Sequence, residues 1–181
     1  MATLPRDLTD MAKVVINEAR KDGKTISTAE SCTGGLISSC LTDIPGSSEA
    51  FLCGFVTYGN EVKTHLLGVP SDAIIEFGAV SDIVAATMAE GALAKSGSDL
   101  AISVTGIAGP YGGSKEKPVG LVYLSLAQLE KDTVIKRYVF AGTRDDIRRS
   151  TVGAALELIL GSLREGSDKD DEETIRKNSS V

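Results

Sequence analysis

Residues 25–41 read TISTAESCTGGLISSCL. The first six, Thr25 to Glu30, are rich in Thr, Ile and Ser and lack helical spacing, which is typical of a strand. The segment SCTGG follows at once and its glycines predict a turn, after which LISSCL is compatible with a helix. The stretch therefore predicts a strand, a tight turn and a helix, with Ser31 at the point where the strand ends.

Further helices and strands are predicted on both sides of this stretch. Apolar residues at 8, 11, 12, 15, 16 and 19 predict a first helix that ends at Lys21, and the pattern from Thr143 to Leu163 predicts a last one. Further helices are expected after Asn60, over 73–77 and over 82–95, and further strands over 50–58, 99–104, 119–127 and 133–141. The LEKD segment between the last two strands predicts a hairpin, so at least one strand pair is antiparallel.

This order of elements predicts an α/β fold. We expect a three-layer α/β/α sandwich with a mixed, mostly parallel sheet and helices on both faces. A length of 181 residues suits one domain. We expect that domain over residues 1–164, followed over 165–181 by a charged, Ser-rich acidic tail that is too polar to fold and is disordered.

The composition excludes several classes of protein. Apolar residues make up 42% and charged residues 24%, as in ordinary folded soluble domains. A net charge of −6 with 4% aromatic residues provides no basic surface for nucleic acid. No apolar stretch reaches about 18 residues, and the opening MATLPRDLTD lacks the pattern of a signal peptide. We therefore expect a cytoplasmic protein with no nucleic-acid or membrane partner.

The chain is poor in metal ligands. Cysteines at 32, 40 and 53 form neither a CxxC pair nor an even disulfide framework, and there is a single histidine. A zinc site would be short of ligands, so we expect no metal and reduced thiols.

Three polar segments follow strands, at the sheet edge where ligands of α/β proteins bind. In the first, Ser31 lies on the rim, while Thr33, Gly34, Gly35 and the N–H groups of the next helix are suited to hold a phosphate or an oxyanion. The alternative is that these residues only start a helix. Cys32 is a rival nucleophile, and the lone histidine, His65, would have to be its base.

The second segment carries Tyr58, Asn60 and Lys63. Asn60 is expected to cap a helix, which places Lys63 in the first turn. There the helix dipole disfavours the charged lysine, and partial burial would act in the same direction, so that Lys63 becomes a base. Taken alone, an exposed lysine in an Asn-capped helix is the commoner interpretation of this pattern.

The third segment is rich in glycine. Thr105, Gly106, Gly109, Gly112 and Gly113 offer hydroxyl and backbone N–H groups of the kind that surround a phosphate, although a surface loop is an equal alternative. Arg144 begins the last helix, where its charge opposes the dipole; this suggests a nearby anion, unless Asp145 and Asp146 satisfy the arginines there.

Four segments together resemble one family: AESCTGG at 29–35, GFVTYGNEVK at 54–63, GAVS at 78–81 and SVTGIAGPYGGSKEKPVG at 103–120. Over about residues 8–163 the chain is similar to the CinA C-terminal family, the nicotinamide-nucleotide amidohydrolases. The resemblance implies the fold of that family and hydrolysis of the carboxamide of nicotinamide mononucleotide, which yields nicotinate mononucleotide and ammonia for the recycling of pyridine nucleotides.

The resemblance also implies roles for particular residues. Ser31 would be the nucleophile, Lys63 the general base, and Tyr58 a hydroxyl that relays or orients protons. The N–H groups near Gly34 and Gly35 would hold the oxyanion. Thr105, Gly106 and the following loop would hold the ribose and phosphate of the nucleotide, with Arg144 as a candidate, and no cofactor would be needed.

Some features depart from the family. Gly59 stands where the family would have a serine, and the N-terminal domain that is similar to molybdopterin-binding proteins is not expected here, nor its pyrophosphatase activity. The alternative functions are a non-catalytic module that binds nucleotide phosphates and a regulatory protein related to competence or DNA damage. We expect a homodimer or higher homo-oligomer.

Overall fold

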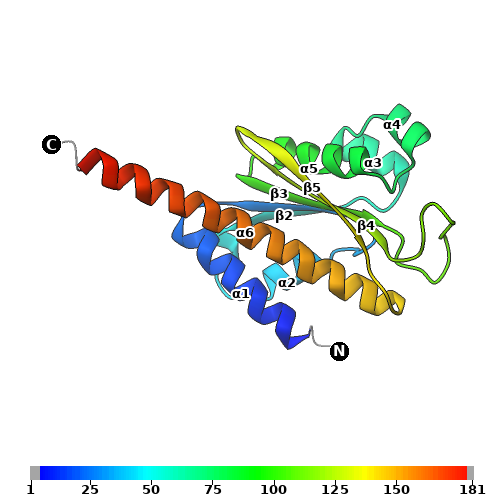
Figure 1. Cartoon of the computed structure of the whole chain (residues 1–181), viewed down its shortest axis with the longest axis horizontal. Helices are drawn as coiled ribbons and strands as arrows, with labels where there is room; N and C mark the ends of the chain where they lie inside the picture. The colour runs from blue at the N-terminus through cyan, green and yellow to red at the C-terminus, as the bar shows by residue number, and fades with distance from the viewer. Residues whose placement is uncertain (1–4, 179–181) are drawn as a thin grey trace.

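The structure of the chain is a computed structural model that describes the backbone of residues 5–178 and the side chains of residues 5–165. A five-stranded sheet lies between two layers of helices (Figure 1). The strands are β1 (Ile26–Glu30), β2 (Phe51–Val56), β3 (Leu100–Gly106), β4 (Leu121–Gln128) and β5 (Lys131–Val139). The helices are α1 (Arg6–Lys21), α2 (Leu36–Thr42), α3 (Asn60–Leu67), α4 (Ser71–Phe77), α5 (Asp82–Ser96) and α6 (Arg144–Asn178), with a 3₁₀ turn, η1 (Ser47–Glu49).

The sheet is mixed, as predicted. Its strand order is β2-β1-β3-β4-β5, and β1 is parallel to both β2 and β3. The β3–β4 and β4–β5 pairs are antiparallel, so β4 alone runs against the other four strands. The prediction of a mixed, mostly parallel sheet inside an α/β/α sandwich is confirmed.

The predicted hairpin exists, but its turn is shorter than expected. Gln128 pairs with Lys131, so the turn consists of Leu129 and Glu130 alone, and Lys131 and Asp132 belong to β5. Glu130 adopts the left-handed conformation, with φ 59°. A positive φ is uncommon for a residue other than glycine and occurs mostly in turns such as this one.

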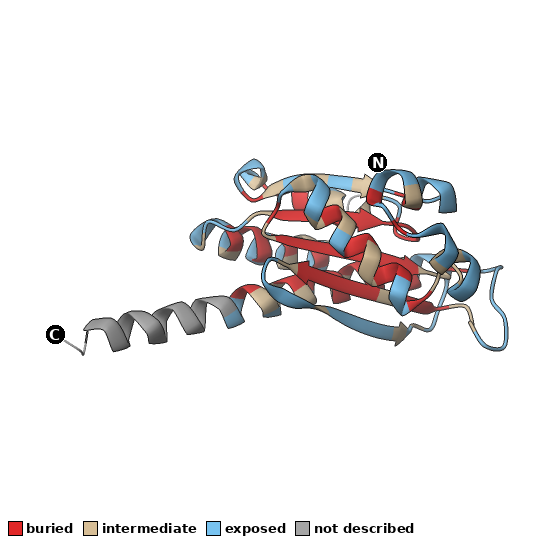
Figure 2. Ribbon diagram, turned by 90° about the horizontal axis from the view of Figure 1, so that it is seen from above, coloured by how far each residue is buried: buried red, intermediate tan, exposed pale blue. Residues whose placement is uncertain are grey.

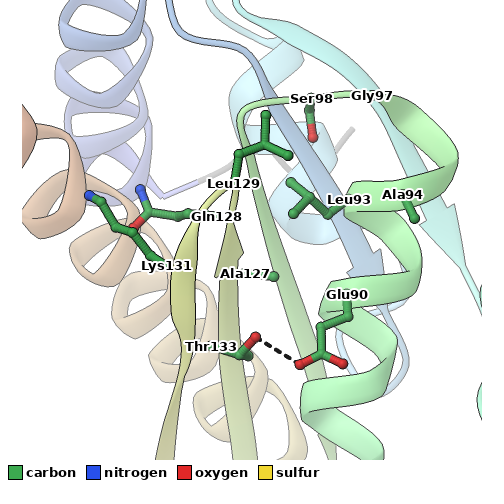
Figure 3. A pocket seen from close by; sticks show the side chains of 10 residues that line it. All are labelled: Glu90, Leu93, Ala94, Gly97, Ser98, Ala127, Gln128, Leu129, Lys131 and Thr133. Atoms are coloured by element: carbon green, nitrogen blue, oxygen red, sulfur yellow. Dashed lines mark hydrogen bonds between the residues drawn. The ribbon is translucent and has the colours of Figure 1, made fainter.

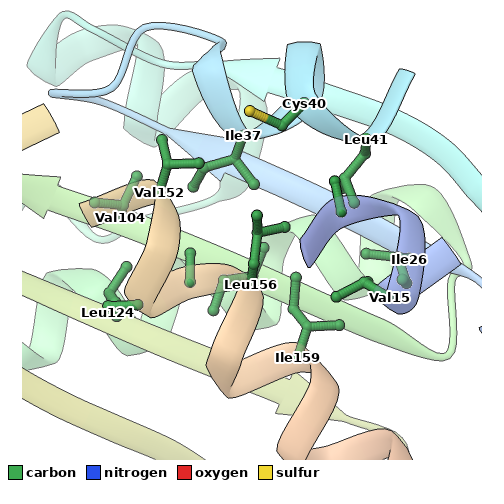
Figure 4. Packing of buried hydrophobic residues seen from close by; sticks show 14 of the residues in the cluster. Val15, Ile26, Ile37, Cys40, Leu41, Val104, Leu124, Val152, Leu156 and Ile159 are labelled. Carbon is green, nitrogen blue, oxygen red and sulfur yellow. The ribbon is translucent and has the colours of Figure 1, made fainter. Parts of the chain in front are cut away.

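Each face of the sheet has its own apolar layer. The larger cluster joins α1, α2 and α6 to the sheet through residues such as Ile37, Leu41, Leu124, Leu156 and Ile159 (Figure 4). The smaller one, with Ala29, Val84, Met88 and Ala101, joins α3 and α5 to the other face. Because both faces are covered, β1 and β3 are buried along their length, whereas β5 is largely exposed (Figure 2). This burial explains the continuous apolar run of β3.

The last helix is longer than predicted. α6 continues to Asn178, whereas we expected a disordered segment from residue 165. Glu, Lys and Arg propagate an existing helix at little cost once its first turns are formed. The disordered tail over 165–181 stays a prediction. Side chains from residue 166 onwards, and the whole of 179–181, lie outside the described residues.

The three polar segments meet at one edge of the sheet. Glu30, the last residue of β1, pairs with Val56 of β2 and with Val104 of β3, so the chain leaves all three strands side by side. Ser31, Thr57 and Thr105 lie there, at the carboxyl ends of the parallel strands, as the sequence predicts for a ligand site.

Candidate active site

Ser31 and Lys63 are in contact. Ser31 follows β1 directly and its N–H donates to the Val104 carbonyl of β3 (3.0 Å), which fixes the start of the turn. Lys63 lies in the first turn of α3, and its Nζ is 3.2 Å from Ser31 Oγ. Lys63 is only 1% exposed, so the interpretation as a solvated surface lysine is wrong.

Burial shifts the Lys63 amine toward its neutral form. Burial lowers the pKa of Lys63, because an ammonium loses its hydration there. Nζ also lies 2.8 Å from the Thr57 carbonyl oxygen and 3.3 Å from that of Tyr58. A neutral amine has two N–H groups, and these two carbonyls accept both of them. Its lone pair is then left for the Ser31 hydroxyl, which is the arrangement that a general base requires.

Cys32 is poorly suited to be the nucleophile. Its side chain is 6% exposed, and burial raises the pKa of the thiol to about 11, so it stays protonated at neutral pH. His65, the base that this alternative needs, lies on an exposed face of α3, away from the face that buries Lys63 and Leu67.

Glu30 organises the turn, a role that we did not predict from the sequence. Its fully buried carboxylate accepts hydrogen bonds from the backbone N–H groups of Gly35, Ile37 and Ser38 at 2.8–3.1 Å. The hydroxyls of Thr33 and Ser38 also donate to it, at 2.7 Å each. An acid at the end of a strand, one short turn before a helix start, is the signal that reveals such a role, because unpaired N–H groups at that end of the helix attract a negative charge.

These contacts change the expected oxyanion site. Gly35 N–H donates to Glu30, and Gly34 N–H donates to the Ser31 carbonyl at 3.1 Å. Neither is free for a substrate oxygen, and the Thr33 hydroxyl is likewise occupied by Glu30. Glycine is needed at position 35 for its backbone conformation instead, because its φ of 95° is one that other residues rarely adopt.

Replacement of Glu30 by glutamine is expected to destabilise the fold by roughly 2–4 kcal/mol, since an amide NH₂ would face N–H and O–H donors that now share a carboxylate. Urea unfolding measures the loss. The control is Glu49→Gln, which alters an exposed ion pair with Arg20 and is expected to cost less than about 1 kcal/mol. Equal losses in the two variants would show that the buried carboxylate is not what holds the turn.

The remaining residues of the second segment lie differently from expectation. Gly59 rather than Asn60 is the N-cap of α3, and no side chain caps that end. Asn60 is the exposed first residue of the helix. Tyr58 approaches Lys63 through its carbonyl, whereas its hydroxyl accepts a hydrogen bond from Arg144 (3.2 Å) and its side chain is 61% exposed.

The third segment is anchored at several points. The Thr105 hydroxyl donates to the Ala79 carbonyl at 2.7 Å, and the Gly109 carbonyl accepts from Arg144 at 2.8 Å. At Gly106 a Cβ would lie 2.8 Å from the Leu121 carbonyl, so this glycine allows close pairing with β4. Gly112 and Gly113 lie in an exposed stretch, 111–116, beyond these anchors.

Lys117 fixes the far end of this loop, a contact that the sequence did not predict. Its ammonium donates to the carbonyls of Phe77 and Val80, at 2.5 and 2.7 Å. The loop is therefore held to the start of α6 on one side and to the turn between α4 and α5 on the other.

Two arginines of α6 border the turn of residues 31–35, which we call the serine turn. Arg144 joins Gly109 to Tyr58, and Arg148, one helical turn later, donates from Nη2 to the Thr33 carbonyl at 2.7 Å. Within residues 5–165, neither guanidinium has a carboxylate within 4.0 Å. Asp146 does not satisfy them: it accepts from the N–H and hydroxyl of Thr143, which lowers the pKa of Asp146. Two cationic groups thus border the segments that follow β1 and β2.

A separate cavity of about 500 Å³ lies between α5 and the β4–β5 hairpin, at the opposite end of the sheet (Figure 3). Its lining includes Leu93, Leu129 and the Glu90–Thr133 hydrogen bond of 2.8 Å, and none of the predicted site residues.

Among the described side chains, no cluster of His, Cys, Asp or Glu is arranged to hold a metal ion. No helix in the described part of the chain is long and apolar enough to cross a membrane.

Comparisons with known proteins show the family of the chain. The model of the CinA C-terminal domain family matches residues 8–163. A CinA-like protein of Geobacter sulfurreducens is 56% identical over 144 residues, which are 80% of this chain and 35% of that protein. A putative competence-damage inducible protein of Caldanaerobacter subterraneus is 47% identical over 150 residues, 83% of this chain and 36% of that protein.

A solved structure is also similar. The competence/damage inducible protein CihA from Agrobacterium tumefaciens is 45% identical, with a TM-score of 0.87 over 91% of this chain and 99% of that one. The chain spans about a third of the length of the curated relatives that it matches.

Proposed function

The chain belongs to the CinA C-terminal domain family, and we propose that it is an amidohydrolase that converts nicotinamide mononucleotide to nicotinate mononucleotide and ammonia. The observation that carries the proposal is the 3.2 Å contact between Ser31 Oγ and the buried Nζ of Lys63. A buried lysine without an acidic partner is costly to a fold, and a pure binding module has no need of one at a serine.

In the first half of the reaction Lys63 takes the proton of the Ser31 hydroxyl while Oγ bonds to the carboxamide carbon. The carbonyl oxygen becomes an oxyanion in the tetrahedral intermediate. Lys63 then returns the proton to the amide nitrogen, the C–N bond breaks, and ammonia leaves. The products of this half are ammonia and an acyl-enzyme on Ser31.

The oxyanion needs hydrogen-bond donors other than Gly34 and Gly35, which are occupied. We assign the N–H of Cys32 to this role, since the residue after the nucleophile supplies an oxyanion donor in hydrolases that place their serine on a strand-to-helix turn. In this assignment Cys32 contributes its backbone, while its buried thiol takes no part.

The two arginines are assigned to the phosphate of the nucleotide. Arg144 and Arg148 have no acidic partner among the described side chains, and guanidinium groups bind phosphate oxygens in a bidentate manner. Tyr58 would orient Arg144 through their 3.2 Å contact rather than relay protons. The glycine-rich loop anchored by Lys117 and Arg144 would cover the ribose.

Arg148→Gln is expected to raise KM for nicotinamide mononucleotide by roughly 10- to 100-fold with little change in kcat, because a charged hydrogen bond to phosphate is lost. The matched control is Arg149→Gln, an exposed neighbour that lies 4.0 Å from Asp7. Nicotinamide riboside lacks the phosphate, so its KM is expected to be the same in wild type and Arg148→Gln. If Arg148→Gln raises KM for the riboside as much as KM for the nucleotide, Arg148 does not bind the phosphate.

Ammonia release from nicotinamide mononucleotide, nicotinamide riboside, nicotinamide adenine dinucleotide and free nicotinamide tests the proposed substrate. The mononucleotide is expected to have the highest kcat/KM. The competing function is a regulatory protein related to competence or DNA damage, as the names of the relatives suggest for those proteins. Tight binding of the nucleotide without any ammonia would favour that alternative.

A further inference from the structure

Two buried polar side-chain atoms have no hydrogen-bond partner within the described residues, Thr57 Oγ1 and Arg148 Nε. Both belong to residues at the serine turn. An unpaired buried donor or acceptor costs free energy, so such atoms are rare unless a ligand or a reacting group pairs with them. The phosphate assigned above accounts for Arg148. Nothing in the mechanism so far uses the hydroxyl of Thr57.

Thr57 shares its face of the sheet with the catalytic pair. Glu30 and its partner Val56 are the last residues of β1 and β2, and Glu30 faces α2, where it contacts Ser38. Successive residues of a strand point to opposite faces. Ser31 and Thr57, one residue further along, therefore lie on the face of α3, where Ser31 contacts Lys63.

The Thr57 backbone is held on both sides. Its N–H donates to the Glu30 carbonyl at 2.9 Å, and its carbonyl accepts from Lys63 Nζ at 2.8 Å. The hydroxyl therefore belongs to the residue whose carbonyl holds the Lys63 amine. Thr57 is completely buried, so bulk solvent supplies no partner for its hydroxyl.

The neighbouring threonines are paired. Thr33 donates to Glu30 and Thr105 donates to Ala79, at 2.7 Å each. Thr105, the last residue but one of β3, lies at the same edge of the sheet, so the location alone does not leave a hydroxyl without a partner.

We propose that the Thr57 hydroxyl is a further catalytic residue that holds the hydrolytic water for deacylation; this rests on the proposed amidohydrolase function. The water donates one hydrogen to Thr57 Oγ1 and the other to the neutral Lys63 amine. Its oxygen bonds to the acyl carbon as Lys63 takes the proton. Lys63 then returns that proton to Ser31 Oγ as the C–Oγ bond breaks, which yields the carboxylic acid and the free serine.

The test is Thr57→Val, which keeps the shape of the side chain and removes the hydroxyl. We expect kcat for nicotinamide mononucleotide to fall by about tenfold or more, with a rapid release of about one ammonia per enzyme and an acyl adduct on Ser31 in quenched samples. Thr57→Ser is expected to restore most of kcat. The melting temperature of Thr57→Val is expected to equal or exceed that of wild type, because an unpaired buried hydroxyl is removed.

The matched control is Thr151→Val, a buried threonine of α6 whose hydroxyl donates to the Ile147 carbonyl at 2.7 Å. It is expected to keep wild-type kcat without a burst. Unchanged kcat in Thr57→Val, or a reduced kcat without burst or adduct, would overturn the proposal. A lower melting temperature in Thr57→Val would also contradict it, since the hydroxyl would then have a partner in the free protein.

A second substrate separates this proposal from the proposed function. p-Nitrophenyl acetate acylates a nucleophilic serine whatever its natural substrate, and Thr57→Val is expected to slow the deacylation of that acetyl-enzyme too. A wild-type protein that turns over the ester and leaves nicotinamide mononucleotide intact would contradict the proposed substrate alone. Wild-type protein that reacts with neither compound would contradict both proposals.

Discussion

Replacement of Lys63 by arginine is expected to reduce kcat/KM for nicotinamide mononucleotide by roughly 10²- to 10⁴-fold, about as much as replacement by alanine. A guanidinium keeps the positive charge but does not give up its proton at any working pH, so it is no base. The effect is large because Nζ lies 3.2 Å from Ser31 Oγ, within reach of its proton. Steady-state kinetics of the two variants beside wild type measure it.

The same account predicts the pH dependence of the wild-type enzyme. Burial lowers the pKa of Lys63, so kcat/KM is expected to rise with pH through an apparent pKa below the ordinary lysine value of about 10.4. Between the lowered pKa and about 10.4 the unfolded chain binds more protons than the folded one. The free energy of unfolding is therefore expected to increase with pH over that window, and this increase is expected to be absent in Lys63→Ala.

Near-normal turnover by Lys63→Arg would show that Lys63 acts as a positive charge that positions the substrate, and not as the base. The base would then have to be sought at Tyr58, Glu61 or His65. A pH profile of kcat/KM that is flat up to pH 10 would lead to the same conclusion.

Replacement of Ser31 by alanine is expected to lower kcat by roughly 10⁴- to 10⁶-fold, as loss of the nucleophile does in serine hydrolases. The fold is expected to remain intact, because the hydroxyl lies on the rim of the sheet and its removal leaves the Ser31 N–H bond to Val104 in place.

Cys32→Ala is the matched control for Ser31→Ala. It is expected to retain much of the activity, since a thiol with a pKa of about 11 is not a nucleophile at neutral pH. The cost to stability is expected to be that of a small buried side chain. If activity survives in Ser31→Ala and is lost in Cys32→Ala, the thiol is the nucleophile and the serine mechanism is wrong.

The fold was predictable because its signals are local. The change from a stretch rich in Thr, Ile and Ser over 25–30 to glycines at 34 and 35 marks β1 and the turn within one short segment. The spacing of apolar residues marks α1, and the strands follow from their composition and alternation. The hairpin turn was placed too broadly, because Lys131 and Asp132 have side chains typical of loops, whereas their backbones pair with β4.

The contacts of the site were less predictable because they join residues far apart in the chain. Lys63 was recognisable as a candidate base, but its burial depends on how α3 packs. Arg148 reaches Thr33 across 115 positions of sequence, and no local pattern reports that contact. The sequence also does not show which N–H groups are already hydrogen-bonded. The glycine N–H groups predicted to hold an oxyanion donate to the Glu30 carboxylate and to the Ser31 carbonyl.

The most direct test of a Ser31–Lys63 amidohydrolase is the yield of ammonia and nicotinate mononucleotide from nicotinamide mononucleotide, measured for wild type, Ser31→Ala and Lys63→Arg at equal concentrations. The account predicts equal molar amounts of the two products from wild type and almost none from either variant. Absence of both products from folded wild-type protein, or wild-type yields from Ser31→Ala, would contradict it.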